Sequence, residues 1–334
     1  MSWKGTLRSM KASARKSERN SQRRQRDLQK RKAEFTKMEA LEQAKYEVEV
    51  YENQIDVLLS VHKECGEEID WESFINRAEP AQPQQSDNAE SAARNQEQTY
   101  RPGFFARLFK LESKQRKKLL DSIETAKRAD KDRFSQETQD WQYEHRGWQD
   151  EQNLARRILS GDAQAKLDAI KMLDPLSDIS LLGTSVNFSV GTTGIVDVSL
   201  SVHGSRVIPS EVKSLLQSGK LSTKKMPVGK YNELLQDYVC SCSLRVGREL
   251  LSILPDEMVV VTAVDSILNS ATGHVETLPI LSVAFSRQTL KSLNIEHLDP
   301  SDTMKNFLHN MSFKKTTGFS PVSRVEPPQP VVNA

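Results

Sequence analysis

Residues that are apolar with one exception, Lys127, recur at a strict seven-residue interval along one central stretch of the chain. The row consists of Leu120, Lys127, Phe134, Trp141, Trp148 and Ala155, and mostly charged and amide residues lie between its members. A narrow apolar row without proline is typical of a long amphipathic helix that packs against another helix. The sequence therefore predicts a helix over residues 112–160, with Phe134, Trp141 and Trp148 as its seam.

The partner of this helix is expected to come from an earlier part of the same chain. The row next to the seam is acidic (Asp130, Glu137, Glu144 and Glu151), which disfavours a symmetric zipper made of two copies. Residues 27–65 show a second helical pattern, and Pro175 ends a third pattern over residues 163–173. We therefore predict a helical hairpin, a coiled-coil-like stalk over residues 27–173. At about 1.5 Å per residue it would extend on the order of 60 Å.

Between the two long helical patterns lies a stretch without large apolar side chains. Residues 79–99 contain no aromatic and no large aliphatic residue, so we expect a flexible linker. An apolar cluster follows it, made of Phe104, Phe105, Leu108, Phe109 and Leu111. We expect this cluster to pack against the base of the long helix; the alternative is a segment that touches a membrane or docks a partner.

After residue 174 the pattern changes to that of a mixed α+β domain. We predict strands over residues 186–190, 195–202, 258–264 and 278–285, and helices over residues 209–218, 229–254, 287–293 and 301–311. These elements predict an α+β fold over residues 174–319, with a mainly antiparallel sheet packed on the long 229–254 helix. The tail over residues 320–334 is rich in proline and valine and is expected to be loose.

The net charge of +2 hides a strong asymmetry along the chain. Residues 1–33 contain twelve Lys and Arg side chains against Glu18 and Asp27, so this segment carries +10 and the remainder −8. Residues 1–26 are predicted to be a disordered basic arm. The candidate anion-binding residues are Arg19, Arg23, Arg24, Arg26, Lys30, Arg31 and Lys32, with a second basic group of Lys220, Lys224 and Lys225. Such a charge favours an acidic partner, for example nucleic acid.

One short motif suggests catalysis. Asp197, Glu211 and Lys213 follow the D…ExK order of restriction-type endonucleases, in which two carboxylates hold Mg²⁺ and the lysine steadies the attacking water. That chemistry needs Glu211 and Lys213 on one side of a strand. The helix predicted over residues 209–218 would instead point them about 200° apart, which counts against a nuclease.

Other chemistry receives little support from the sequence. Cys65, Cys240 and Cys242 lack the spacing of a zinc site, and we expect Cys242 to be buried as a small apolar residue. No phosphate-binding glycine loop follows a predicted strand. The chain has no run of 18 apolar residues and its start lacks a signal-peptide core, so we expect no membrane span and a cytoplasmic location.

These observations favour a non-enzymatic interaction or scaffold protein that uses no cofactor. The stalk would bind a protein partner or a second copy of the chain, and the basic arm would capture an acidic partner such as nucleic acid. The alternative hypothesis is a Mg²⁺-dependent DNA endonuclease that uses Asp197, Glu211 and Lys213.

Overall fold

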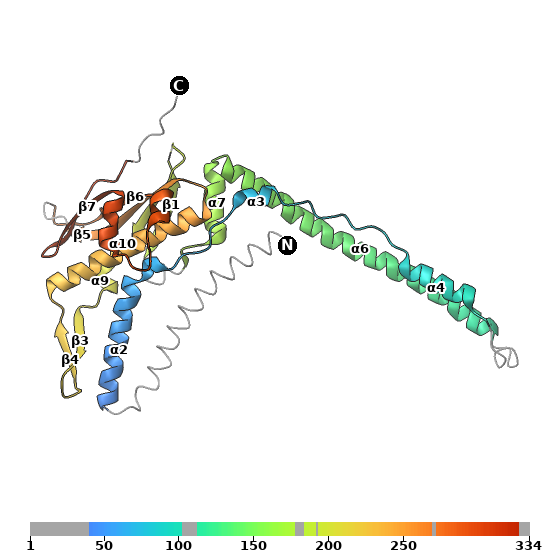
Figure 1. Cartoon of the computed structure of the whole chain (residues 1–334), viewed down its shortest axis with the longest axis horizontal. Helices are drawn as coiled ribbons and strands as arrows, with labels where there is room; N and C mark the ends of the chain where they lie inside the picture. Colours follow the sequence, from blue (N-terminus) through green and yellow to red (C-terminus); the bar gives the residue numbers. More distant parts are fainter. Residues whose placement is uncertain (1–39, 102–111, 178–183, 192, 269–271, 327–334) are drawn as a thin grey trace, which may run out of the picture. The chain divides into compact units, whose positions relative to one another are not determined.

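The computed structural model describes residues 40–101, 112–177, 184–191, 193–268 and 272–326 (Figure 1). The described chain forms two compact units. Ser73–Leu154 make up the first, here called the helical unit, and residues 40–72 and 155–326 make up the second, the α+β unit. The arm residues from Arg19 to Lys32 and the apolar cluster from Phe104 to Leu111 lie outside the described residues.

The helical unit is built on α6 (Glu112–Leu159), a single helix of 48 residues, which confirms the long helix predicted over residues 112–160. Beside it lies α4 (Asn88–Thr99) (Figure 1). The prediction that residues 79–99 have no structure is therefore wrong for residues 88–99. Alanine, glutamate and glutamine predominate there and favour a helix even without large apolar side chains, and Ala93 is buried.

The seam of α6 contacts an extended segment of chain in place of a second long helix. The indole nitrogens of Trp141 and Trp148 donate hydrogen bonds of 3.0 Å to the backbone oxygens of Pro80 and Arg77. Phe134 is half-buried, whereas Leu120, at the start of the row, is 54% exposed. The predicted coiled-coil hairpin is not confirmed, because a heptad of indoles can be covered by extended backbone that accepts their N–H groups.

The α+β unit contains a six-stranded sheet in the order β1-β2-β5-β6-β7-β8. Its strands are β1 (Ser185–Val190), β2 (Val196–Ser201), β5 (Met258–Leu268), β6 (Val275–Ser286), β7 (Leu308–Lys314) and β8 (Gly318–Ser320). All neighbouring strands are antiparallel except β2 and β5. The predicted α+β class with a mainly antiparallel sheet is confirmed.

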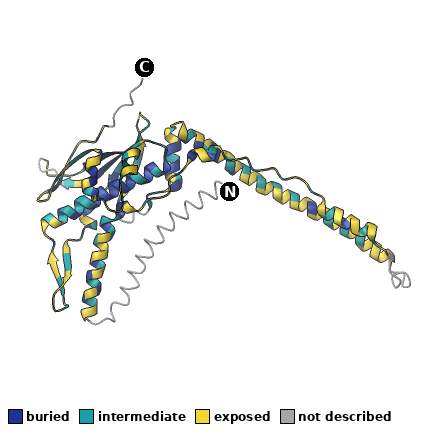
Figure 2. Ribbon diagram, in the orientation of Figure 1, coloured by how far each residue is buried: buried dark blue, intermediate teal, exposed yellow. Residues whose placement is uncertain are grey.

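The α+β unit also contains helices. They are α2 (Ala40–Leu59), η1 (Val61–Lys63), α3 (Trp71–Ile75, continuing into the helical unit), α7 (Ala163–Leu173), α9 (Gly204–Val207), α10 (Val228–Ile253), α11 (Arg287–Ser292), α12 (Pro300–Thr303) and η2 (Met304–Asn306). The longest of them in this unit, α10, packs against β5, β6 and β8 and contributes much of the core (Figure 2). A Cβ atom at Gly247 would lie only 2.5 Å from the ring of Phe285, so glycine permits this close packing.

Of the helices predicted in the α+β unit, one is a strand in the structure and another is helical only in its first part. Residues 209–218 contain β3 (Glu211–Leu215), which forms a separate antiparallel hairpin with β4 (Leu221–Lys225). The hairpin packs against α2, and Gly219 provides the turn with a φ of +78°. Residues 301–311 hold α12 and η2 but continue into β7. Short apolar runs fit the period of a helix as well as that of a strand, so strand pairing in the folded chain decides which element forms.

The tail after β8 is packed as far as residue 326, which corrects the expectation that it is loose from residue 320. Val325 is 7% exposed, and its N–H donates to the Ser282 hydroxyl at 2.9 Å. The N–H of Val322 donates to the backbone oxygen of Pro279 at 2.9 Å. These bonds place the segment alongside β6, where Val325 becomes part of the core.

Candidate functional site

The linker after α2 lies across α10 and is fixed to it by hydrogen bonds. We call residues 61–72 the strap. The bonds run from His62 N to Ser241 Oγ at 3.0 Å, from Gly66 N to Glu249 Oε1 and Oε2 at 3.1 Å, from Ile69 N to Ser252 O at 2.8 Å, and from Trp71 Nε1 to Ile253 O at 2.7 Å. Backbone N–H groups that leave water need such partners. Buried polar residues of α10 therefore determine the path of the strap.

A buried ion pair supports the strap from below. Arg245 and Glu249, one turn apart on α10, are 5% and 3% exposed and approach to 2.6 Å. Glu249 also receives the Gly66 N–H, and a Cβ atom at Gly66 would lie 3.2 Å from Glu249 Oε2. Glycine at this position thus lets the strap lie close to the carboxylate. Arg245 compensates the charge of Glu249, which would otherwise be costly to bury.

His62 is the most buried residue of the strap, at 1% exposure. Its Nδ1 lies 2.9 Å from the Ser241 hydroxyl, and Arg248 donates to its backbone oxygen. Burial, together with the nearby charges of Lys63 and Arg248, lowers the pKa of His62 to about 4. Ser241 has no exposed surface, so the His–Ser contact joins two packed side chains that a substrate does not reach.

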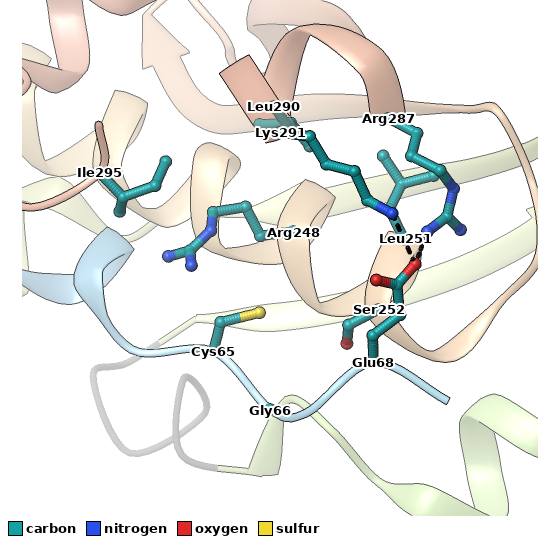
Figure 3. A pocket seen from close by; sticks show the side chains of 10 residues that line it. All are labelled: Cys65, Gly66, Glu68, Arg248, Leu251, Ser252, Arg287, Leu290, Lys291 and Ile295. Carbon is teal, nitrogen blue, oxygen red and sulfur yellow. Dashed lines mark hydrogen bonds and ion pairs between the residues drawn. The ribbon is translucent and has the colours of Figure 1, made fainter. Parts of the chain in front are cut away.

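A pocket of about 230 Å³, here called the basic pocket, opens between the strap, α10 and α11 (Figure 3). The strap contributes Cys65, Gly66 and Glu68; α10 contributes Arg248, Leu251 and Ser252; α11 contributes Arg287, Leu290 and Lys291; and Ile295 follows α11. The lining thus has three cationic side chains and one carboxylate. This charge favours anions.

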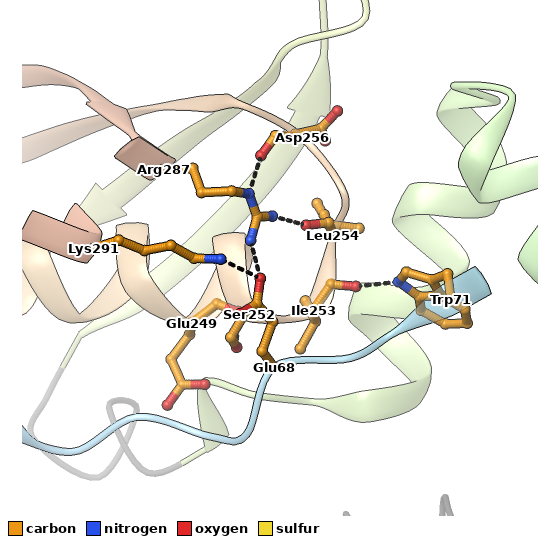
Figure 4. Close-up of polar contacts among 9 residues, drawn as sticks. All are labelled: Glu68, Trp71, Glu249, Ser252, Ile253, Leu254, Asp256, Arg287 and Lys291. Atoms are coloured by element: carbon orange, nitrogen blue, oxygen red, sulfur yellow. Dashed lines mark hydrogen bonds and ion pairs between the residues drawn. The ribbon is translucent and has the colours of Figure 1, made fainter. Parts of the chain in front are cut away.

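Glu68 bridges two of the three cations. Its Oε1 lies 2.5 Å from Arg287 Nη1 and 3.1 Å from Lys291 Nζ (Figure 4). Arg287 is held in place by further bonds to the backbone oxygens of Asp256 at 3.1 Å and Leu254 at 2.5 Å. The side chains of Glu68 and Lys291 are 53% and 60% exposed. The guanidinium is therefore rigid, whereas the carboxylate and the ammonium are free to rearrange.

A second pocket, of about 440 Å³, shares Glu68 and Arg287 with the first. Its apolar wall includes Ile69, Trp71 and Leu254, all of which are largely buried. The Glu68–Arg287 pair therefore lines both pockets, and the second also contains the carboxylates of Asp70 and Glu72.

The cysteines have the properties of packed side chains. Burial raises the pKa of Cys65, in the wall of the basic pocket, to about 11, so its thiol is neutral and a poor nucleophile. Burial likewise raises the pKa of Cys242 to about 12 and that of Cys240 well above its usual value. Both residues on α10 have no exposed surface, which confirms the expected burial of Cys242.

The residues of the nuclease hypothesis are divided between two sheets. Glu211 and Lys213 lie two apart on β3 and so share a side of that strand, which removes the helix-based objection. Lys213 forms an ion pair of 2.7 Å with Glu47 of α2. Asp197 lies on β2 in the large sheet, with Arg324 at 3.6 Å. Over the described ranges, no group of three or more His, Cys, Asp or Glu side chains is arranged to hold a metal.

The predicted basic group of the α+β unit lies on the β3–β4 hairpin. Lys224 and Lys225 are at the end of β4, Lys220 precedes that strand, and all three are exposed. The basic pocket, by contrast, was not predicted from the sequence. Its residues come from positions near 65, 250 and 290, and strap, helix and short helix meet only in the folded chain.

Comparisons with protein-family models, with curated proteins and with solved structures find no match to this chain. Its function is therefore argued from geometry and charge. One further observation concerns the helices that the structure describes: none of them combines the length and the apolar character needed to cross a membrane.

Proposed function

We propose that this chain is a non-enzymatic interaction protein in which the helical unit reaches a partner. The proposal depends on the length and the exposure of α6. At about 1.5 Å per residue its 48 residues extend about 70 Å, and most side chains between residues 113 and 154 are exposed or half-buried. Ordering so long an element costs conformational entropy that no large core offsets. Contact with a partner far from the α+β unit would explain why the chain keeps so long a helix.

The surface offered to the partner is the side of α6 that residues 74–99 leave open. The seam is already occupied, because Trp141, Trp148 and Gln152 bind backbone oxygens of the extended segment. At the start of α6, Gln115 contacts the hydroxyl of Tyr100, the residue that follows α4. By sequence, the segment between α4 and α6 carries Phe104, Phe105 and Phe109. We propose that the partner contacts these side chains as well as the open side of α6.

Self-association of the purified chain tests this contact. Sedimentation velocity over a range of concentrations is expected to show a reversible dimer for the full chain. A variant with serine at Phe104, Phe105 and Phe109 is expected to remain monomeric. The matched control is the exposed Leu308→Ser, which removes one large apolar side chain in the α+β unit. A full chain that stays monomeric at every concentration would count against a contact between copies.

The basic arm gives the protein a second, electrostatic contact. A charge of +10 over residues 1–33 attracts phosphate backbones through release of counterions. We expect fluorescence anisotropy to show binding to duplex DNA that weakens steeply with salt. A chain that lacks residues 1–33 is expected to lose this binding, and unchanged affinity after truncation would exclude the arm as a nucleic-acid element.

The competing hypothesis of a Mg²⁺-dependent nuclease is favoured by one observation, the shared side of Glu211 and Lys213 on β3. Incubation of the protein with plasmid and Mg²⁺ separates the two hypotheses. Cutting that is lost in Glu211→Ala and kept in Glu257→Ala, an exposed carboxylate elsewhere in the unit, would replace the interaction role with catalysis.

A further inference from the structure

We propose that the basic pocket binds a small organic anion, whose carboxylate or phosphate oxygens contact Arg248, Arg287 and Lys291. In the structure the Glu68 carboxylate occupies the position that one ligand oxyanion would take. The proposal is independent of the helical unit and of the basic arm. It concerns a site in the α+β unit alone.

The lining of the basic pocket carries a net positive charge. The formal charge of its lining is +2, from three cations and Glu68. The carbonyl oxygens that fix Arg287 are neutral acceptors, so the compensating charge comes from Glu68, which Lys291 shares. The nearby Glu249 lies beneath Gly66 and is already paired with Arg245 at 2.6 Å. An additional anion would therefore be attracted to this pocket.

The cations are also positioned before any ligand arrives. Arg287 is rigid for the reasons given above, and one Nη atom of Arg248 donates to the backbone oxygen of His62, which holds the base of that guanidinium against the strap. A guanidinium carries five N–H donors, so the remaining ones are suited to the oxygens of a carboxylate or phosphate. Figure 3 shows Arg248 toward one end of the pocket and Lys291 with Arg287 toward the other.

Glu68 is a replaceable occupant. Its side chain is 53% exposed, and ion pairs that face water contribute little free energy, about 0–1 kcal/mol at the median. The strap itself is held by the backbone bonds of Gly66 and Ile69, which do not involve the Glu68 side chain. A ligand oxyanion can therefore displace this carboxylate while the strap stays in place.

The size and the walls of the pocket define the ligand class. A volume of about 230 Å³ is below the ~300–1,000 Å³ of sites for drug-sized molecules, so the ligand is small. Leu251, Leu290 and Ile295 add apolar surface between the charged ends. A short aliphatic carboxylate or phosphate ester fits both properties.

Isothermal titration calorimetry on the full chain at low salt tests the proposal. The probes are succinate, glycerol 3-phosphate and inorganic phosphate, with uncharged glycerol as the blank. Binding of succinate identifies a carboxylate site, and binding of glycerol 3-phosphate a phosphate-ester site. Binding of neither, or of inorganic phosphate alone, overturns the proposal.

Substitutions show where a bound probe lies. Arg248→Gln is expected to weaken binding about tenfold or more, because it removes a charge-assisted hydrogen bond. Glu68→Gln removes the internal competitor and is expected to tighten binding severalfold. Lys305→Gln, the matched control, removes an exposed cation outside the pocket and leaves binding unchanged.

Circular dichroism establishes that each variant is folded. If Arg248→Gln fails to fold, Lys291→Gln replaces it, because that side chain is 60% exposed and tolerates exchange. Equal affinities of the pocket variant and of Lys305→Gln would overturn the assignment of the site.

Discussion

Burial of the strap residue His62 makes the stability of the α+β unit depend on pH. In the unfolded chain the imidazole titrates near pH 6.5, whereas in the folded protein its pKa is about 4. Between these values the unfolded state binds more protons, so the free energy of unfolding falls as the pH drops from 6.5 toward 4. We expect a loss of about 2 kcal/mol between neutral pH and about pH 4.5, measured by urea unfolding.

His62→Asn separates this effect from other acid-labile groups. Its amide keeps a polar partner for the Ser241 hydroxyl but does not titrate, so the variant is expected to lose clearly less stability on acidification than the natural chain. His274→Asn, at an exposed turn, serves as the control and should leave the pH profile unchanged. Parallel pH profiles for His62→Asn and the natural chain would contradict the assignment.

A second buried charge gives a prediction at neutral pH. Lys166 of α7, whose side chain is 4% exposed, contacts Asp256 at 2.6 Å and the backbone oxygen of Gly194 at 2.8 Å. Lys166→Met removes the partner of a largely buried carboxylate and is expected to cost about 3–5 kcal/mol in urea unfolding. Adding Asp256→Asn should recover a large part of that loss; a double variant no more stable than Lys166→Met would indicate lost packing as the cause.

At the scale of helices and strands, the side chain of Asp130 on α6 caps the N-terminus of another helix, α4. The side chain of Asp87, at the N-cap of α4, makes no capping bond, and the Asp130 carboxylate instead accepts the N–H groups of Glu90 at 2.8 Å and Ala89 at 3.3 Å. The Glu90 N–H contributes most to lowering the pKa of Asp130. The cap thus persists at neutral pH.

Asp130→Ala is therefore expected to loosen the first turn of α4. Hydrogen exchange followed by mass spectrometry should show faster exchange of the amides of Ala89 and Glu90, with the end of the helix affected less. Asp132→Ala is a matched control, since that exposed carboxylate lies two positions along the same helix. Unchanged exchange in Asp130→Ala would mean that the bonds contribute nothing to the order of α4.

The elements of the fold differ in how well the sequence predicts them. The 48-residue α6 and the alternating strand β2 were predictable, because the period of their apolar residues follows the face that each buries. The partner of the Trp141–Trp148 row was not, because an indole N–H bonds equally well to a helix side chain or to an extended backbone oxygen. The capping of α4 by a residue 40 positions away leaves no local pattern.

The candidate site is unpredictable for a related reason. Arg248 lies on a helix whose other residues are mostly buried, and by pattern alone it is one polar position among many. Only the path of the strap, fixed by backbone bonds to Ser252 and Glu249, brings Glu68 over Arg287. Backbone hydrogen bonds carry no side-chain signature, so sequence patterns do not reveal which segments they join.

At the scale of the whole molecule, the division into two units predicts that one can be removed. Gln152 Nε2 lies 2.6 Å from the backbone oxygen of Phe74, so the chain enters and leaves the helical unit at adjacent points. A short Gly/Ser linker can therefore replace Ser73–Leu154. The remaining chain keeps its sheet, α10 and the strap, and is expected to unfold cooperatively and to bind succinate or glycerol 3-phosphate as the full chain does.

Tryptophan emission reports the outcome of this replacement. Removal of Trp141 and Trp148 leaves Trp3 and Trp71. With Trp3→Phe added, the remaining indole is that of Trp71, which is 2% exposed and donates to Ile253 O in the α+β unit. A blue-shifted emission that is lost in one transition with urea is the expected result, together with loss of self-association. Emission of a solvent-exposed indole before urea is added would mean that the strap needs the helical unit for its fold. Retained self-association would place the partner contact in the α+β unit. The anion site is tested separately, by the ligand titrations.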